Sequence, residues 1–311
     1  MTVIREIQQG SKVTLRDILT GDSEIRLMEA HNGLSALIAC LANSTETDRS
    51  FDALWVSSLT CTAAAGLPDL EMPGIDMRLS IIEQIAQQSS KPILVDGDTG
   101  GSLSMMRFYC RALVRAGVGG VVFEEKAGEK RNSLDTKDQN LADPEEFATK
   151  ISAAVDMVRG SDLMVMARLE GYNAGLPPEE TMTRARRYIT AGADGIFVHS
   201  KSPECSQVRE FAHAFRAEGY TQPIICVPTT FYATTATDLF AGGVNGVIYA
   251  NQQLRAAAAA MVKICRSILD RDGVFEIENA IMPTKQIFDL VGYTDEICRI
   301  AQLTSESATM A

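Results

Sequence analysis

Eight short apolar runs, each followed by a segment with helical spacing, constrain the fold of this 311-residue chain more than any other feature. The runs are Ile25–Met28, Ala53–Val56, Pro92–Val95, Gly120–Phe123, Leu163–Ala167, Gly195–Val198, Pro223–Val227 and Gly246–Tyr249. Continuous apolar runs that alternate with amphipathic helices are typical of parallel strands covered by helices. Eight such units predict a (β/α)8 barrel of the TIM type.

A doubly wound sheet is the weaker alternative, because it usually carries a glycine-rich phosphate turn after its first strand. The residues after the first run, Glu29-Ala30-His31-Asn32-Gly33, do not form such a turn. We therefore expect a single barrel domain over residues 1–311. Residues 256–311 exceed what one barrel needs, and are expected to form a C-terminal helical extension with a break near Pro283.

Composition and charge exclude several classes of partner. The formal net charge of −11 gives no positive field for nucleic acid or for an anionic membrane surface. The seven cysteines show no metal-binding spacing and lie mostly in apolar contexts, as in reduced proteins of the cytoplasm. Residues 1–12 do not resemble a secretory signal, and no apolar run is long enough to span a membrane. We expect a cytoplasmic protein with a small anionic substrate.

Polar side chains follow the apolar runs, and barrel enzymes place their chemistry at the carboxyl ends of the strands. Asp96 and Asp98 follow the third run and Glu124 follows the fourth. Three carboxylates on neighbouring strands predict a Mg²⁺ site, since Mg²⁺ prefers oxygen ligands. The alternative is that Asp96-Gly97-Asp98-Thr99-Gly100 is only a turn with capping aspartates.

Arg168 and His199 follow the fifth and sixth runs, and together they suit a phosphoryl or phosphonyl group. The alternative is a buried ion pair of Arg168 with Glu170 and a histidine of the core. Trp55 precedes Ser57-Ser58-Leu59, a turn whose backbone N–H groups could hold a carboxylate. Trp55 itself could equally belong to the core of the barrel.

The charged stretch after the fourth run, 124–133, contains Lys130, Asn132 and Ser133. A run of charges is usually only a solvated face. Gly128 gives this segment freedom to move, and lysine and asparagine suit a lid that closes over a transferring phosphoryl group.

These motifs together resemble the phosphoenolpyruvate mutase/isocitrate lyase superfamily from about Thr14 to Leu290, and are most similar to its phosphoenolpyruvate mutase branch. The resemblance is carried by the following segments: Met28-Glu29-Ala30-His31-Asn32-Gly33, Leu54-Trp55-Val56-Ser57-Ser58-Leu59, Val95-Asp96-Gly97-Asp98-Thr99-Gly100, Glu124-Glu125-Lys126 with Lys130-Arg131-Asn132-Ser133, Ala167-Arg168-Leu169-Glu170, His199-Ser200-Lys201 and Val227-Pro228-Thr229.

The resemblance implies an isomerase that moves a phosphoryl group between the enol oxygen of phosphoenolpyruvate and the methylene carbon of phosphonopyruvate, the step that forms the P–C bond in phosphonate biosynthesis. It also implies a role for each matching residue. Asp96 would be the main Mg²⁺ ligand, with Asp98 and Glu124 acting through water. Ser57, Ser58 and Leu59 would bind the substrate carboxylate beside Trp55.

Further roles are implied at the phosphoryl end of the substrate and on the loops. Arg168, His199 and Asn132 would hold the phosphoryl group, with Ser133 beside them. Asp69 would be an essential aspartate, either a nucleophile or an electrostatic positioner. Lys130 would belong to the lid. The family forms oligomers by exchanging C-terminal helices, which implies a homodimer or homotetramer here.

The lid separates the branches of the superfamily. The C–C lyases carry a cysteine and a histidine where this chain has Asn132-Ser133, so lyase chemistry is not expected. Phosphonopyruvate hydrolase usually has threonine at the position of Asn132, and remains the first alternative. A catalytically inactive barrel that serves as a binding protein is the second. Glu125, Glu129 and Ser58 depart from the family pattern, and the first two predict a looser, more acidic lid.

Overall fold

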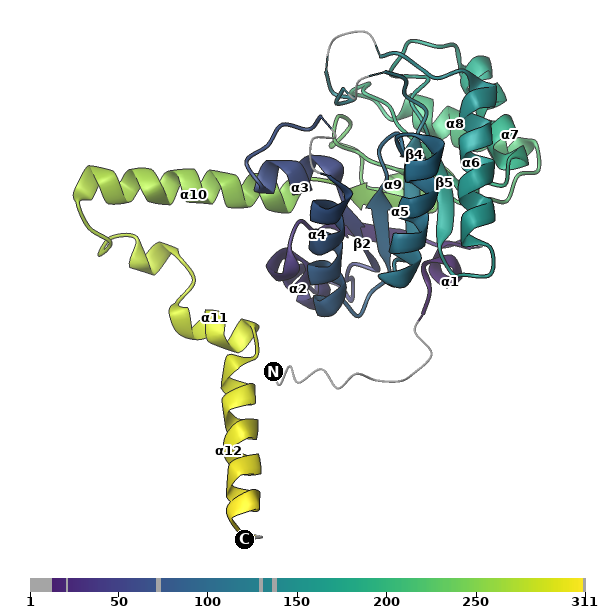
Figure 1. Ribbon diagram of the computed structural model, residues 1–311. Coiled ribbons are helices and arrows are strands. Elements are labelled where there is room, and N and C mark those ends of the chain that lie inside the picture. The colour runs from purple at the N-terminus through teal and green to yellow at the C-terminus, as the bar shows by residue number, and fades with distance from the viewer. Residues whose placement is uncertain (1–12, 21, 71–73, 129–130, 136–138, 310–311) are drawn as a thin grey trace. The chain divides into compact units, whose positions relative to one another are not determined.

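The barrel is closed in the computed structural model, which describes residues 13–20, 22–70, 74–128, 131–135 and 139–309 (Figure 1). All neighbouring strands are parallel, and the sheet closes in chain order through pairing of the first strand with the eighth. The strands are β1 Ile25–Glu29, β2 Ala53–Val56, β3 Ile93–Asp96, β4 Gly120–Glu124, β5 Met164–Leu169, β6 Gly195–Val198, β7 Ile224–Cys226 and β8 Gly246–Tyr249. The predicted fold and its eight strands are confirmed.

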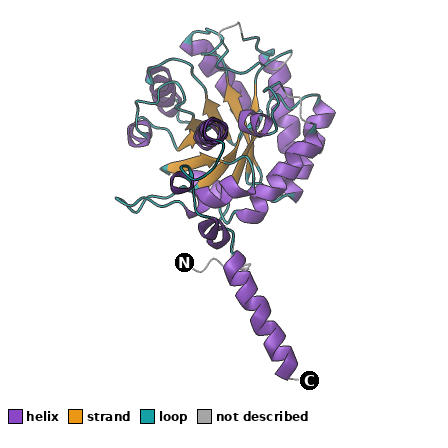
Figure 2. Ribbon diagram, turned by 90° about the vertical axis from the view of Figure 1, so that its left-hand side faces the viewer, coloured by secondary structure: helices purple, strands orange, loops and turns teal. Residues whose placement is uncertain are grey.

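Helices surround the strands on the outside, as seen in Figure 2. They are α2 Gly33–Leu41, α3 Ser58–Ala64, α4 Ile75–Gln88, α5 Leu103–Arg115, α6 Pro144–Val158, α7 Pro178–Thr190, α8 Ser206–Ala217 and α9 Ala236–Ala241. A further short helix, α1 Leu15–Leu19, packs its leucines against the interior of the barrel. Local sequence fixes their ends. Asp143, for example, caps α6 by accepting the N–H groups of Glu145 and Glu146, and Pro144 supplies a first residue that needs no partner.

Two apolar layers stabilise the barrel. The inner layer fills the space enclosed by the strands with side chains such as Leu27, Trp55, Val122 and Phe197, while α1 adds Leu15. The outer layer lies between the strands and the helices. Successive strand residues point alternately to these two layers, and this alternation explains why the strands read as continuous apolar runs. The polar residues that end each strand therefore mark the end of the barrel where the packed interior stops.

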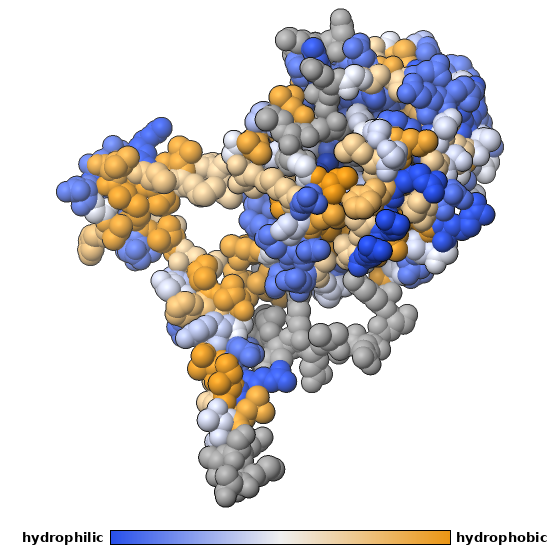
Figure 3. Space-filling model, viewed as in Figure 1, coloured by the Kyte–Doolittle hydropathy of each residue, from blue (hydrophilic) through white to orange (hydrophobic). Residues whose placement is uncertain are grey.

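The chain from Arg255 onward forms a compact unit separate from the barrel unit, Val13–Leu254. It contains most of α10 (Gln252–Arg271), a short 3₁₀ turn η1 (Glu278–Ala280), α11 (Thr284–Leu290) and α12 (Tyr293–Thr309). Pro283 caps α11, at the predicted break. Many apolar side chains of these helices are exposed, among them Met261, Leu269 and Leu303 (Figure 3). Among the described residues, no helix combines the length and apolar character needed to cross a membrane.

Gly97, between Asp96 and Asp98, is required by close packing against β4. A β-carbon at this position would lie 2.5 Å from Cε1 of Phe123 and 2.8 Å from Cγ2 of Val121. Both side chains belong to strand β4 and are fully buried, so neither can move aside without disturbing the core.

We predict that Gly97→Ala lowers the free energy of unfolding by about 1–3 kcal/mol, the usual cost of overpacking a core. Chemical denaturation of the two proteins measures this difference. Gly74→Ala is the matched control, because a β-carbon at Gly74 meets nothing within 4 Å. It should cost less than half as much, and equal losses in the two variants would contradict the packing argument.

Candidate active site

Two of the predicted carboxylates, Asp96 and Asp98, lie at the end of β3 and in the loop that follows, and the backbone of this loop is held against β4. The N–H of Gly97 donates to the carbonyl of Val122 (2.7 Å), and the N–H of Glu124 donates to the carbonyl of Asp98 (2.8 Å). Asp98 has a φ of 50°, a left-handed conformation that aspartate tolerates better than most residues. Its N–H donates to Oδ1 of Asp96 (3.1 Å). These contacts bring Asp96 and Glu124 to the lining of one cavity.

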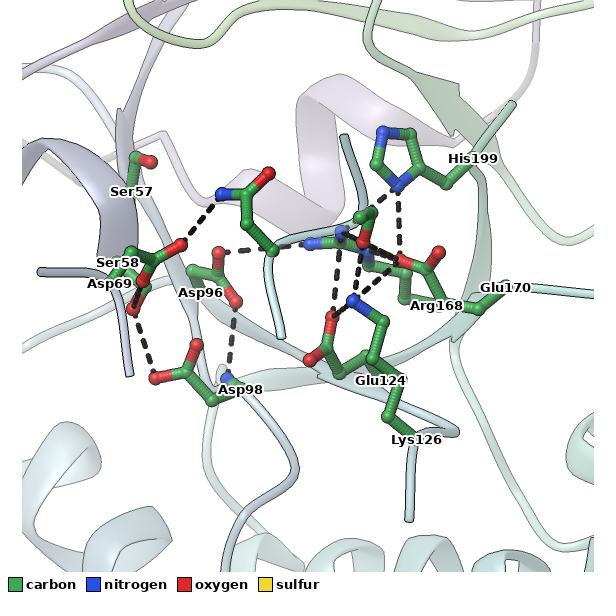
Figure 4. A network of polar contacts seen from close by, with 12 residues as sticks. Ser57, Ser58, Asp69, Asp96, Asp98, Glu124, Lys126, Arg168, Glu170 and His199 are labelled. Atoms are coloured by element: carbon green, nitrogen blue, oxygen red, sulfur yellow. Dashed lines mark hydrogen bonds and ion pairs between the residues drawn. The ribbon is translucent and has the colours of Figure 1, made fainter. Parts of the chain in front are cut away.

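Two buried cations face these carboxylates (Figure 4). Arg168 of β5 is in register with Glu124 of β4, and its Nη2 lies 3.4 Å from Oε2 of Glu124. Its Nη1 lies 3.8 Å from Oδ2 of Asp96. Lys126, just beyond β4, places its Nζ 3.5 Å from the same oxygen of Glu124. The acids from β3 and β4 therefore form ion pairs with side chains of the chain itself.

Glu170 is the central hydrogen-bond acceptor of the site, a role that sequence analysis missed. Its Oε1 accepts from Nε of Arg168 (2.6 Å) and from Oγ of Ser133 (2.8 Å), and lies 3.0 Å from Nδ1 of His199. Its Oε2 accepts from Nδ2 of Asn173 (2.6 Å). Glu170 and Arg168 are two residues apart, on the same side of an extended chain. This spacing was the available signal, although it supported only the ion-pair alternative, and that ion pair is present.

Burial and charge separate the two glutamates. Burial raises the pKa of Glu124 to about 7, although Arg168 and Lys126 act in the opposite direction. Glu170 is also buried, but the charge of Arg168 and the contact with His199 outweigh its burial and hold its pKa well below the usual value. Burial lowers the pKa of His199. The site thus contains one carboxylate that stays ionised and another that titrates near neutral pH.

Two loops meet over the cavity. Nδ2 of Asn132 donates to Oδ2 of Asp69 (2.7 Å), and Oγ of Ser58 donates to Oδ1 of the same carboxylate (3.1 Å). Ser133, next along the chain, accepts from Nζ of Lys126 (2.5 Å) and from Nη2 of Arg168 (2.8 Å). Residues 131–133 of the predicted lid are therefore tied to the edge of the barrel.

One cavity gathers most of the predicted site residues: Trp55, Ser57, Leu59, Asp69, Asp96, Glu124, Asn132, Ser133, Arg168 and His199. Ser58 and Asp98 do not line it, but Oγ of Ser58 lies 3.1 Å from Oδ2 of Asp98, just beside it. Lys130 lies outside the described residues. Trp55 has both roles considered from the sequence, since it belongs to the inner core and also lines the cavity. Lys126 and Phe197 line the cavity without having been predicted.

Glu125 was predicted to loosen the lid, and the structure places it in the barrel wall instead. Its side chain is fully buried. Oε1 accepts from the N–H of Glu170 (2.8 Å), and Oε2 accepts from Nη1 of Arg184 (3.0 Å) and from the hydroxyl of Tyr188. For Glu125 the prediction is wrong, because a carboxylate with three donors fixes the ends of β4 and β5 together.

The donor set suits a hard divalent cation. Oε1 of Glu124 is buried and has no hydrogen-bond partner among the described residues, and Asp96 lines the same cavity. Mg²⁺ typically takes one or two carboxylates and keeps several waters. No group of three or more acidic, histidine or cysteine side chains is gathered for a metal in the part of the chain that is described. Asp96 and Glu124 could supply the one or two carboxylates that Mg²⁺ needs, whereas the carboxylate of Asp98 contacts Arg78 and Ser58.

Known proteins resemble this chain over most of its length, both in sequence and in fold. The family model described as phosphoenolpyruvate phosphomutase matches residues 15–269. The phosphoenolpyruvate phosphomutase of Streptomyces hygroscopicus is 37% identical over 290 residues, which cover 91% of this chain and 90% of the relative. The crystal structure of the phosphoenolpyruvate phosphomutase of Streptomyces platensis subsp. rosaceus has a TM-score of 0.87 at 33% identity, covering 94% and 99% of the two chains.

A hydrolase is also similar in structure. Phosphonopyruvate hydrolase in complex with oxalate and Mg²⁺ has a TM-score of 0.82 at 30% identity, covering 93% of this chain and 96% of the hydrolase chain.

The raised pKa of Glu124 predicts a pH-dependent stability without divalent cations. Between the ordinary glutamate pKa of 4.5 and about 7, the folded protein keeps a proton that the unfolded chain has lost. The contribution of Glu124 to stability therefore falls as pH rises through this range. Glu124→Gln removes the effect, so its Tm relative to the unchanged protein should be higher at pH 8 than at pH 5. Thermal melting in EDTA measures this, and a constant difference would contradict the assignment.

Proposed function

The chain belongs to the phosphoenolpyruvate phosphomutase family, and we propose that it interconverts phosphoenolpyruvate and phosphonopyruvate. In this isomerisation the P–O bond to the enol oxygen breaks and a P–C bond to the methylene carbon forms. The observation that carries the proposal is one cavity in which the acids Asp96 and Glu124 face the guanidinium of Arg168 and the imidazole of His199. Residues that can bind a cation and residues that can bind a phosphoryl group thus lie close enough to contact the same small dianionic or trianionic substrate.

Arg168, His199, Asn132 and Ser133 are proposed to hold the phosphoryl group. Phosphoryl transfer with a loose transition state needs positioning and charge neutralisation more than covalent help. Arg168 is fixed for this role, because Glu170 binds its Nε and the ring of Phe197 lies 5.1 Å below the guanidinium carbon. A guanidinium that is already oriented loses little entropy when it binds an anion.

The other end of the substrate, its carboxylate, is proposed to bind at Ser57, Ser58 and Leu59, where β2 ends and α3 begins. Trp55 and Phe197 form an edge-to-face pair 6.0 Å apart beneath the cavity. Their rings would exclude water from one side of the reacting carbon, where water would otherwise intercept the phosphoryl group.

Asp96 and Glu124 are proposed to hold Mg²⁺, with Asp96 as the main ligand. When bound, the cation would neutralise negative charge that develops on the enolate oxygen. Glu124 must give up its proton to serve as a ligand, and its pKa of about 7 places this loss near neutral pH.

Asp69 is proposed to be a positioner rather than a nucleophile. Oδ2 accepts from Asn132 and Oδ1 accepts from Ser58, so both of its oxygens are engaged. A carboxylate held on both sides is better suited to fixing neighbouring loops than to attacking phosphorus. Lys130 is proposed to belong to the lid, as the resemblance implies.

The protein is proposed to form a homo-oligomer in the cytoplasm. The apolar side chains exposed on α10, α11 and α12 support association into a homo-oligomer in which these helices cover another subunit. The barrel and these helices would then act as one functional domain. Reduced cysteines and the acidic net charge support a cytoplasmic protein with neither nucleic acid nor membrane as its partner.

Phosphorus NMR after addition of phosphonopyruvate and Mg²⁺ tests the function. We predict conversion to phosphoenolpyruvate, and no conversion by Asp96→Ala with an unchanged circular dichroism spectrum. Free phosphate as the sole product would favour the hydrolase. No reaction at all would favour an inactive binding protein, and an active Asp96→Ala variant would refute the metal assignment.

Asn132→Ala should lower turnover by about 10²-fold or more, the usual effect of losing one donor that stabilises a transition state. Steady-state kinetics with phosphonopyruvate measure this change. Asn140→Ala is the matched control, since Asn140 is an exposed asparagine of the same loop region. Equal rates in the two variants would mean that Asn132 does not touch the substrate.

A further inference from the structure

Arg78 contacts the end of β3 and the loop after it, which contains Gly97 and Asp98, and no sequence motif predicted this contact. It belongs to α4, and its Nη1 donates to Oδ2 of Asp98 while its Nη2 donates to the backbone carbonyl of Asp96. Its side chain is 14% exposed, and that of Asp98 is 2% exposed. The guanidinium carbon lies 5.7 Å from the ring centre of Tyr109 in α5. A permanent positive charge, largely shielded from solvent, thus lies against the end of β3, next to the proposed metal ligand Asp96.

Asp98 supplies most of the negative charge that faces Arg78. The other groups around the guanidinium are Asp96, Tyr109 and Cys61. Burial raises the pKa of both Tyr109 and Cys61 to about 12, so these two are neutral at physiological pH. Asp96 contributes its carbonyl to Arg78, while its carboxylate lines the cavity. The charge of Asp98 is therefore largely compensated before any cation arrives.

The backbone of the loop does not depend on this ion pair alone. The N–H and the carbonyl of Asp98 are bonded to Asp96 and Glu124, and Gly97 is bonded to β4. Oγ of Ser58 also lies 3.1 Å from Oδ2 of Asp98, so its one proton is shared between Asp98 and Asp69. Removing the guanidinium charge should thus leave the loop in place while changing the electric field at the metal site.

We propose that Arg78 is a positioning residue and the fixed counter-cation of the metal site: it keeps Asp98 out of the ligand set and weakens the affinity for divalent cations. The proposal rests on the metal site of the proposed function and refines it. The resemblance assigned Asp98 to the metal through water. The contacts instead assign it to Arg78, which leaves Asp96 and Glu124 as the carboxylates of the site.

The direction in which metal affinity changes on substitution distinguishes this role from a structural one. Supporting groups around a metal site usually raise its affinity, and their loss costs about 10–100-fold. Arg78→Met removes a positive charge near a cation, so we expect Mn²⁺ to bind about tenfold more tightly. Asp98→Asn should weaken binding by about the same factor. The double variant removes a neutral pair, and its Kd should lie within about threefold of the unchanged protein.

Electron paramagnetic resonance of free Mn²⁺ in a titration of the full-length protein gives each Kd without substrate or activity. Arg107→Met is the matched control, because Arg107 pairs with Asp156 on the surface, at 3.6 Å, and should not alter the Kd. If Arg78→Met alone fails to fold by circular dichroism, the double variant, which buries no unpaired charge, carries the test.

Two results would overturn the proposal. One is weaker or unchanged Mn²⁺ binding in Arg78→Met. The other is a double variant that binds as weakly as Asp98→Asn, which would make Asp98 a ligand. Asp96→Ala separates this failure from that of the proposed function. Unchanged Mn²⁺ binding in Asp96→Ala refutes the metal site itself, whereas lost binding there leaves the site standing while Arg78 is judged by its own variants.

Discussion

The parallel register between β4 and β5 is the constraint on which the site depends. It sets Glu124 directly beside Arg168, and just beyond the two strands the N–H of Glu170 donates to the carboxylate of Glu125. The β3 loop is then positioned through its own bonds to β4. Since each strand is packed on both faces, a shift of one residue would exchange the side chains of the inner and outer apolar layers. The geometry of the catalytic end is therefore determined by the core of the barrel.

Buried charge is the principal cost of this arrangement, and the chain compensates it internally. Arg168 and Lys126 face Glu124, while Arg78 faces Asp98. Removing one member of such a buried pair leaves an uncompensated charge and is strongly destabilising. The balance also makes binding selective, since a cation and a highly charged anion disturb it least when they enter together. A site of this kind can take up phosphonate or phosphate esters although the whole chain is acidic.

The sequence allowed prediction of whatever is encoded locally. The order of apolar and polar residues identifies strands buried on both faces and the polar residues that end them. The barrel and residues such as Asp96 and His199 could therefore be located. Glu170 has two partners close to it in the sequence, Arg168 and Asn173, but Ser133 and His199 reach it from other segments of the chain. Arg78 sits within a helix with ordinary spacing, and only the tertiary fold brings it to Asp98. Contacts of this kind leave no local pattern.

The hydrogen bond between Asn132 and Asp69 bears on how the site can open. The amide proposed to hold the phosphoryl group already donates to a carboxylate, at 2.7 Å. Carboxylate and phosphoryl oxygens are both anionic acceptors, so substrate can replace Asp69 at this donor with little net change in hydrogen bonding. An exchange between two similar acceptors requires no large strain in the loop. Binding of a phosphoryl group would then release Asn132 from Asp69, because the phosphoryl oxygen takes the place of the carboxylate as its acceptor.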